Sequence, residues 1–554
     1  MLLERYLPRI EFDSYEDFKQ NYQVNVPDNF NFAYDIVDEW AKLDNTKKAL
    51  VWCDDHGSER EFTFEELRRL SNQAAHFFMD HGIGKGDVVM LILRRRFEYW
   101  ICALALCKIG ATLIPATLQL TPKDIIYRCN AAEVKMVVCV DDAQVLDHVE
   151  QSLPKTKTLQ AKAVVAGSRE GWLDFTTEIA KYPDELKRPA LVNKNDDIML
   201  IYFTSGTTGM PKMVAHDFTH PLGHIVTAKY WQRVQDGKLH MSVSDSGWAK
   251  FGWGKIYGQW ICGAVIFAYD MDRFHAKNLL SMVQKYHVTT FCAPPTMFRF
   301  MLQEDLTQYD LSSIKHCCIA GEPLNPEVFK QFKEITGLKL TEGFGQSESS
   351  VLVANFEWFD PKPGSMGKPS PLYDIDIVDS NGNSCPDGEE GEIVVRNVAK
   401  CRPTGLFMGY YKDEEVTAEV MQGGNYNTHD VAWRDSDGYY WFVGRSDDVI
   451  KCSGYRIGPF EVESALIEHP AVLECAVTAV PDLVRGQVVK ATIVLTKHYS
   501  PSDALKKELQ NHVKRVTAPY KYPRVIEFVE ELPKTIGGKI KRALIRNEDK
   551  EKDQ

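Results

Sequence analysis

One segment concentrates residue types that could bind phosphate. Residues 202–217 read YFTSGTTGMPKMVAHD, with hydroxyl side chains and glycines ahead of a Pro-Lys pair. Hydroxyls and glycine amides can approach phosphate oxygens closely, and the Lys212 ammonium adds a positive charge. The segment is not a Walker P-loop, because there lysine follows glycine directly, whereas two residues separate Gly209 from Lys212. A polar surface turn after the apolar run Ile198–Phe203 is the alternative reading of this segment alone.

Composition narrows the class of protein around this segment. The chain has 554 residues, 44% of them hydrophobic, which predicts two or more domains with sizeable cores. A net charge of −12 without a long basic run argues against nucleic acid or an anionic membrane as an obligatory partner. The 13 cysteines form no C-x-x-C pair and lie in apolar contexts, which predicts buried, reduced thiols and a cytoplasmic location. The N-terminal residues carry early charges and a proline, so we expect neither a signal peptide nor a membrane span there.

The order of apolar and turn-forming residues predicts the elements that position these groups. From about Phe62 to Asp310, helical patterns alternate with short apolar runs, which predicts parallel sheets covered by helices. A capping box of Thr63 and Glu66 is expected to start one of these helices. From about residue 365, short strands separated by Gly, Pro and Asn-Gly turns predict a β-rich, barrel-like subdomain. We therefore expect an α/β protein with an N-terminal domain over 1–446, including that subdomain over about 365–446, and a small α/β domain over 447–554.

Six segments in order resemble the AMP-forming acyl-CoA synthetases of the adenylate-forming superfamily. They are TSGTTGMPK, AGEPL, EGFGQSES, YNTHD, FVGRSDDVIKCSGYRIGPFEVE and PKTIGGKIKR. The resemblance spans almost the whole chain, and the C-terminal segments are most similar to medium-chain acyl-CoA synthetases. It implies a large AMP-binding domain followed by a mobile C-terminal lid domain that rotates about Asp447. It also implies that residues 204–212 form a cradle for the pyrophosphate of a nucleotide.

The resemblance implies roles for individual residues around ATP. Ser347 would contact the α-phosphate, Glu348 would bind Mg²⁺, and the Asp430 carboxylate would accept the ribose hydroxyls. Lys539 would reach the α-phosphate and the substrate carboxylate, so Lys539, Ser347 and Glu348 are the predicted catalytic residues. His429 stands where glycine is usual, and we assign it no role. The full predicted ATP-binding set is Thr204, Ser205, Gly206, Thr207, Thr208, Gly209, Met210, Pro211, Lys212, Gly321, Glu322, Pro323, Glu342, Gly343, Phe344, Gly345, Gln346, Ser347, Asp430, Arg445, Arg456 and Lys539.

Coenzyme A and the acid would occupy two further regions. Acetate-specific relatives carry tryptophan where this chain has Gly345, so the pocket should accept acids larger than acetate. Trp253 is the candidate wall at its far end. The predicted positions near coenzyme A are Gln119, Ser453, Gly454, Tyr455, Arg485, Lys514, Tyr522, Pro523 and Arg524.

The implied reaction joins a short-to-medium-chain carboxylic acid to coenzyme A. The acid attacks the α-phosphorus of MgATP to give acyl-AMP and pyrophosphate, and the coenzyme A thiol then displaces AMP. Such a ligase would serve fatty acid metabolism. An aryl-CoA ligase for a benzoate-like acid and a non-catalytic nucleotide-binding relative are the alternatives. The physiological acid and the oligomeric state, a homodimer being one alternative, are left open by the sequence.

The glycine-flanked position of Lys539 predicts a role in one half-reaction only. Its ammonium would stabilise charge that develops on the α-phosphoryl group, so Lys539→Ala should slow acyl-AMP formation by on the order of a hundredfold or more. Supplied acyl-AMP and coenzyme A should still give thioester at a rate close to wild type. Pyrophosphate release and thioester formation, measured separately, check this prediction. An equal loss in both half-reactions, with the fold intact, would contradict it.

Overall fold

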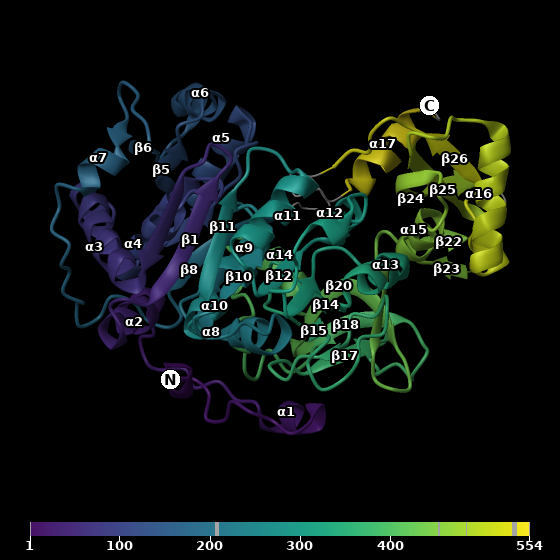
Figure 1. The fold of residues 1–554 in the computed structure, drawn as a ribbon, viewed down its shortest axis with the longest axis horizontal. Coiled ribbons are helices and arrows are strands. Elements are labelled where there is room, and N and C mark those ends of the chain that lie inside the picture. The colour runs from purple at the N-terminus through teal and green to yellow at the C-terminus, as the bar shows by residue number, and fades with distance from the viewer. Residues whose placement is uncertain (1, 205–209, 453–454, 483–484, 535–539, 553–554) are drawn as a thin grey trace.

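A nine-stranded sheet forms one half of the N-terminal region (Figure 1). The computed structural model describes residues 2–204, 210–452, 455–482, 485–534 and 540–552. The central strands of this sheet are parallel, and its outermost strands on both sides pair antiparallel. The strand order is β16 (Lys368–Pro369), β15 (Val353–Ala354), β14 (Leu340–Phe344), β13 (His316–Ile319), β12 (Thr290–Ala293), β10 (Leu239–Ser242), β11 (Val265–Asp270), β1 (Lys48–Asp54) and β2 (Glu59–Thr63).

An eight-stranded sheet forms the other half of this region. Six of its strands run parallel, while β9 pairs antiparallel with both β8 and β19. Its central strand β3 is buried at every residue, as expected for a parallel strand covered on both faces. The strand order is β19 (Gly409–Tyr410), β9 (Lys212–Asp217), β8 (Ile198–Thr204), β4 (Thr112–Pro115), β3 (Val88–Ile92), β5 (Val134–Val140), β6 (Ala161–Val165) and β7 (Leu173–Asp174).

The helices of the N-terminal region connect these strands and follow the sequence signals closely. The predicted capping box forms at the start of α3, where Thr63 accepts from the backbone N–H of Glu66 and the Glu66 carboxylate accepts from that of Thr63. The helices are α1 (Tyr15–Asn21), α2 (Asp38–Leu43), α3 (Phe64–Asp80), α4 (Glu98–Ile109), α5 (Pro122–Ala132), α6 (Ala143–Ser152), α7 (Phe175–Ile179), α8 (His220–Gly223), α9 (Ala249–Lys255), α10 (Tyr257–Ile261), α11 (Ala276–Lys285), α12 (Pro295–Met301), α13 (Pro326–Thr336) and α14 (Glu414–Val420).

The β-rich segment forms an open antiparallel sheet. Its strand order is β17 (Ile375–Val378), β18 (Gly391–Val395), β20 (Tyr426–Arg434) and β21 (Tyr440–Arg445). This antiparallel sheet is the β-rich subdomain that the pattern of short strands and turns predicted. Among the described residues β17 and β21 are its edge strands and do not pair with each other.

The C-terminal part has a sheet and a hydrophobic core of its own. Figure 1 shows it at one end of the long axis of the molecule (yellow), opposite the N-terminal elements (purple). Val462, Leu466 and Ile493 pack there with Leu509 and Val513 in a separate cluster. Its elements are β22 (Ile450–Cys452), β23 (Tyr455–Ile457), α15 (Pro459–Ile467), β24 (Val472–Asp482), β25 (Gly486–Leu495), α16 (Asp503–Val516), β26 (Val525–Phe528) and α17 (Arg542–Lys552).

The cysteines agree with the expectation of buried thiols. All 13 cysteines are free thiols, and only Cys401 is exposed. Among the described residues, no helix combines the length and the apolar composition that a bilayer span requires.

Asp447 lies in the turn that joins β21 to β22, between the open sheet and the C-terminal part. A rotation between two half-reactions would have to change backbone angles in this turn, and proline fixes φ. Asp447→Pro should therefore leave one half-reaction close to wild type and slow the other strongly. Separate assays of acyl-AMP formation and of thioester formation from supplied acyl-AMP measure this. Near-wild-type rates in both would remove Asp447 as the hinge.

Candidate functional site

Residues from three predicted motifs meet where β14, β20 and β21 lie together. The Gln346 amide Nε2 donates to Oδ2 of Asp430 at 2.5 Å and to the Thr428 carbonyl at 2.8 Å. Tyr426 donates its hydroxyl to the Gln346 side-chain oxygen. Asp430 and Arg445 face each other as register partners of β20 and β21. Motifs separated by about a hundred positions in the sequence thus form one polar cluster.

Glu348 lies two residues after Gln346 in the sequence, and its side chain is half-buried. Its carboxylate Oε1 accepts a hydrogen bond from the Tyr410 hydroxyl at 3.0 Å, and its carbonyl accepts from the Phe407 N–H at 2.7 Å. Burial raises the pKa of the Glu348 carboxyl, while Tyr410 and the Arg445 charge act to lower it. The Lys212 ammonium lies 4.9 Å from the centre of the Tyr410 ring. A carboxylate, a lysine and an arginine therefore share one partly desolvated region.

Thr204 and Lys212 hold the two ends of the predicted phosphate-binding segment together, because they are register partners of β8 and β9. Within this segment, Met210 is exposed and the Pro211 carbonyl accepts from the Tyr127 hydroxyl at 2.9 Å. Several predicted residues lie outside the described part of the chain, and for Arg456 only the backbone is described. The residues outside it are Ser205, Gly206, Thr207, Thr208, Gly209, Ser453, Gly454 and Lys539.

The predicted adenine segment at 321–323 lies beside β14. Glu342 is buried, and its Oε2 accepts from the Leu324 N–H at 3.2 Å. Burial raises the pKa of Glu342 to about 7. Lys250 donates its ammonium to the Ala320 carbonyl at 2.5 Å, and Thr296 donates its hydroxyl to Glu322 Oε2 at 2.7 Å. The Glu342 carboxylate thus holds the loop that carries Gly321, Glu322 and Pro323, and its contact with adenine stays a prediction.

Gly343 in β14 and Gly345, directly after that strand, each lie against an indole ring. A Cβ atom on Gly343 would lie 2.4 Å from Cε2 of Trp231, and one on Gly345 would lie 2.3 Å from Cη2 of Trp253. The two indoles meet edge to face, with ring centroids 6.3 Å apart and planes at 90°. Only glycine permits such close approach at both positions. Gly345 therefore does not face open space, because Trp253 already fills the volume beside it.

The Trp253 backbone is fixed from behind by two buried amides. Gln259 Nε2 donates to the Trp253 carbonyl at 2.7 Å, and Gln232 Nε2 donates to the same oxygen at 3.2 Å. The two amides also bond to each other at 2.5 Å. Neither glutamine belongs to a motif, and a lone glutamine in an apolar run carries no signal that would have singled it out. The same holds for Trp231 and for Tyr410.

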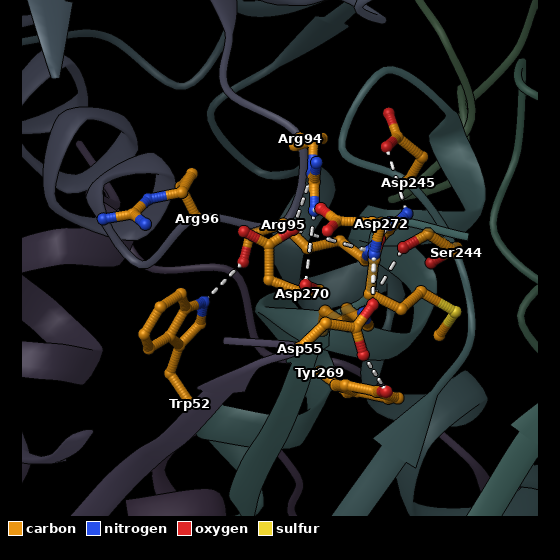
Figure 2. A network of polar contacts seen from close by, with 12 residues as sticks. Trp52, Asp55, Arg94, Arg95, Arg96, Ser244, Asp245, Tyr269, Asp270 and Asp272 are labelled. Carbon is orange, nitrogen blue, oxygen red and sulfur yellow. Dashed lines mark hydrogen bonds and ion pairs between the residues drawn. The ribbon is translucent and has the colours of Figure 1, made fainter. Parts of the chain in front are cut away.

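An ion-pair network joins the two large sheets at the carboxyl ends of β3 and β11 (Figure 2). Arg94 Nε pairs with Asp270 at 2.8 Å, and its Nη2 pairs with Asp272 at 2.9 Å. Arg95 pairs with Asp245 at 3.3 Å. Because Asp245 lies in the connection from β10 to α9, the network ties the helix that carries Trp253 to both sheets.

His429 adopts a left-handed backbone conformation with φ of 58°. Such a conformation favours glycine, which explains why glycine is usual at this position in the family it resembles. Here Glu392 compensates, since its Oε1 accepts from the His429 N–H at 2.9 Å and lies 3.3 Å from Nδ1. Glu392 also raises the pKa of the His429 ring. The departure from the family pattern is thus accommodated locally.

Most predicted coenzyme A positions lie on the C-terminal part. The Lys514 ammonium lies 3.9 Å from the centre of the Tyr522 ring, and Arg524 lies 4.7 Å from the same ring. Tyr455 stacks on Tyr520 with centroids 4.1 Å apart. Pro523 stands between Tyr522 and Arg524 in the sequence. Arg485 pairs with Asp482. Gln119 lies apart from these residues, in the N-terminal region after β4.

Comparison with known proteins adds two family matches. Residues 37–411 match the AMP-binding enzyme family, and residues 461–539 match the AMP-binding enzyme C-terminal domain. The chain is 44% identical over 550 residues to the mitochondrial acyl-coenzyme A synthetase ACSM3 of Mus musculus, covering 97% of this chain and 94% of that protein. It is 45% identical over 535 residues to the mitochondrial acyl-coenzyme A synthetase ACSM5 of Homo sapiens, covering 95% and 91%.

Solved structures share the fold over nearly the full length. The anthranilate CoA ligase AuaEII in complex with anthranoyl-AMP superposes with a TM-score of 0.88 at 31% identity, covering 95% of this chain and 99% of that one. The acyl-CoA synthetase of Brucella canis gives a TM-score of 0.72 at 30% identity, covering 98% and 100%.

The predicted cytoplasmic location is wrong. The similar acyl-coenzyme A synthetases are named as mitochondrial proteins, which points to mitochondria. The error has a simple physical cause. Buried, reduced thiols exclude an oxidising compartment but do not distinguish between reducing ones.

His316 makes the stability of the site sensitive to acid. It is buried and bonds through Nε2 to the Trp231 carbonyl at 2.8 Å, and burial together with the Arg233 charge lowers its pKa to about 3. Between pH 6.5 and about 3 the unfolded chain binds a proton that the folded ring does not. Stability therefore falls as the pH drops through this window, by up to about 1.4 kcal/mol per pH unit for this group.

His316→Gln keeps a donor near the Nε2 position and removes this titration. The free energy of unfolding, measured by urea titration at several pH values, should then fall less steeply below about pH 6.5 in the variant than in wild type. Parallel pH profiles for the two proteins would contradict the assignment.

Proposed function

The chain belongs to the AMP-binding enzyme family, and we propose that it is an AMP-forming acyl-CoA synthetase of the medium-chain type. The reaction converts a carboxylic acid, ATP and coenzyme A into acyl-CoA, AMP and pyrophosphate. The observation that carries this proposal is the meeting of Gln346, Glu348 and Asp430 with Lys212 and Arg445, next to the packed indoles of Trp231 and Trp253. The similar acyl-coenzyme A synthetases support it.

The residues of the polar cluster would bind and orient ATP. The Asp430 carboxylate, which Gln346 orients through Oδ2, would accept the ribose hydroxyls, since a carboxylate oxygen can accept more than one hydrogen bond. Arg445 adds positive charge near the ribose and the phosphates, and the neighbouring Asp430 and Asp447 keep its pKa above the ordinary value against the effect of burial. Lys212 would meet the departing pyrophosphate. The chain thereby aligns the α-phosphorus for attack by the acid, which mainly requires positioning and charge neutralisation.

Glu348 fits a role in holding Mg²⁺. The Tyr410 hydroxyl donates to Oε1 and holds the carboxylate in place. A hard divalent cation prefers carboxylate, phosphate and water oxygens, and one protein carboxylate beside a polyphosphate matches that preference. When bound, the ion would neutralise charge on the phosphates. The raised pKa of the Glu348 carboxyl is the expected state before a cation arrives.

The second half-reaction would use the other predicted surface. The thiol of coenzyme A attacks the acyl carbon of acyl-AMP, AMP leaves, and the thiol proton passes to solvent. Lys514, Arg524 and Tyr522 offer cations and an aromatic face to the nucleotide end of coenzyme A. We propose that residues 447–554 form a lid that rotates about Asp447 between the steps. The two family matches leave residues 412–460 between them, a gap that includes Asp447 and supports this boundary.

The packed indoles indicate the class of acid. Since Trp253 is held by two amides and by Gly345, the pocket should end at a fixed apolar wall. We propose a short-to-medium-chain acid, in keeping with a role in fatty acid metabolism. A planar aromatic acid is the second candidate, because two edge-to-face indoles suit a flat ring and a similar structure is an anthranilate CoA ligase.

A panel of acids with wild type and Trp253→Ala tests the function and the wall together. Acetate, butyrate, octanoate, benzoate and palmitate would be compared by kcat/KM in a coupled AMP assay. Wild type should prefer a short-to-medium-chain acid, and Trp253→Ala should move the preference to longer acids. Each extra buried methylene contributes up to about 0.8 kcal/mol. Gly345→Trp is unsuitable as a test, because even a Cβ there collides with Trp253.

Trp441→Ala serves as the matched control. Trp441 stacks on Trp433 in the open sheet and should leave the chain-length preference unchanged. Absence of acid-dependent AMP formation with every acid would sink the proposed function. An unchanged chain-length preference in Trp253→Ala, with activity retained, would contradict only the role of Trp253 as the end of the acyl-binding site.

A further inference from the structure

Three buried histidines stack between the phosphate-binding strand and the acyl site. His216 lies near the end of β9, His220 is the first residue of α8, and His224 directly follows that helix. Their rings follow one another with centroids 3.8 Å apart between His216 and His220 and 4.7 Å apart between His220 and His224. Each is at most 2% exposed. We call His216, His220 and His224 the histidine stack.

One end of the histidine stack holds the backbone of the ATP motif. His216 Nε2 lies 2.7 Å from the Ser347 carbonyl. A carbonyl only accepts, so Nε2 carries the hydrogen and donates it. The next residue is Glu348, whose own carbonyl is held by the Phe407 N–H. The peptides on both sides of the Glu348 Cα atom are therefore fixed by hydrogen bonds from elsewhere in the chain.

The other end of the histidine stack touches the acyl site. The His224 ring stacks on Tyr257 with centroids 5.8 Å apart and planes at 21°, and it lies 6.1 Å from the Trp253 ring. His224 and His220 also bond to each other through their Nε2 atoms at 3.1 Å. The rings thus form a continuous contact path from Trp253 to Ser347.

The backbone around the histidine stack has little freedom to shift. A Cβ atom on Gly223 would lie 2.5 Å from the Gly405 Cα atom, so α8 presses directly on the segment that leads to Phe407. Asp217 accepts from the Thr219 hydroxyl at 2.7 Å and pairs with Arg402. Such support from several elements is what a positioning residue needs.

We propose that His216 is a positioning residue for adenylation, whose hydrogen bond to the Ser347 carbonyl aims the Glu348 carboxylate at the metal that accompanies ATP. His220 and His224 hold the His216 ring in place by packing. The proposal rests on the proposed function, which assigns Glu348 to Mg²⁺. It predicts that loss of the hydrogen bond weakens use of the metal without affecting the step that needs no ATP.

Two other roles fit the histidine stack less well. Among the described residues, no group of three or more His, Cys, Asp or Glu side chains is arranged to hold a metal ion, which argues against the histidine stack as a metal centre. Pure core packing would not explain a ring nitrogen held on the carbonyl that precedes Glu348. The two readings differ in what a substitution should do.

The test compares variants of His216 that keep or remove the donor. His216→Leu removes it, His216→Gln restores an amide donor near the Nε2 position, and His216→Asn places its amide near Nδ1 instead. His240→Asn is the matched control, because His240 is equally buried but bonds to Thr290 through Nδ1. The Mg²⁺ concentration for half-maximal pyrophosphate release is measured for each protein, together with thioester formation from supplied acyl-AMP.

A second measurement avoids turnover altogether. The rise in Tm caused by Mg²⁺ is recorded in the presence of a non-hydrolysable ATP analogue and no acid. His216→Leu and His216→Asn should need on the order of tenfold more Mg²⁺ in both measurements, as for other residues that orient a metal ligand. His216→Gln should need close to the wild-type amount, and all variants should retain thioester formation.

Glu348→Gln separates the two proposals. If Glu348→Gln leaves the Mg²⁺ requirement unchanged, the metal assignment in the proposed function fails. If Glu348→Gln raises it and His216→Leu and His216→Asn do not, only the role of His216 fails. Equal losses in both half-reactions without rescue by His216→Gln would reduce the histidine stack to core packing. Should His216→Leu not fold, the comparison of His216→Asn with His216→Gln decides the question.

Discussion

The contact of two indole rings with two glycines is the constraint on which the site depends. Trp231 and Trp253 occupy the volumes where side chains at 343 and 345 would lie, and they meet each other edge to face. Close packing leaves no room for either ring to move without a cavity or a collision. The direction of β14 as it enters the segment 346–348 and the position of the acyl wall are therefore set by the same contact.

Polar groups reach this centre from elements that are far apart in the sequence. Lys212 is the first residue of β9, Tyr410 lies on β19, and Asp430 lies on β20. Glu348 stands among them with a raised pKa, because it is partly desolvated before a cation and a nucleotide are present. The ion pairs of Arg94 with Asp270 and of Arg95 with Asp245 link the two large sheets to each other.

Sequence and structure agree where a signal is local. The capping box at Thr63, the strand before Thr204 and the free cysteines were predictable, because turn chemistry, periodicity and burial act over a few residues. The order in which the strands of the three larger sheets pair was not predictable, since strand order and register are long-range properties. The predicted compartment was wrong, because thiol chemistry reports redox conditions and not a location in the cell.

The amino-acid sequence by itself determined the family, through glycines, hydroxyls, carboxylates and lysines whose order along the chain matches one chemistry. Only the tertiary structure decided which side chains support them. Tyr410 at Glu348, Gln232 and Gln259 behind Trp253, and His216 on the Ser347 carbonyl carry no local pattern, because each acts through a contact between distant segments. The reason why glycine is usual at the position of His429 likewise follows only from the positive backbone φ angle there. A motif records which atoms meet the substrate, whereas the groups that aim those atoms are selected by packing, which the order of residues alone does not display.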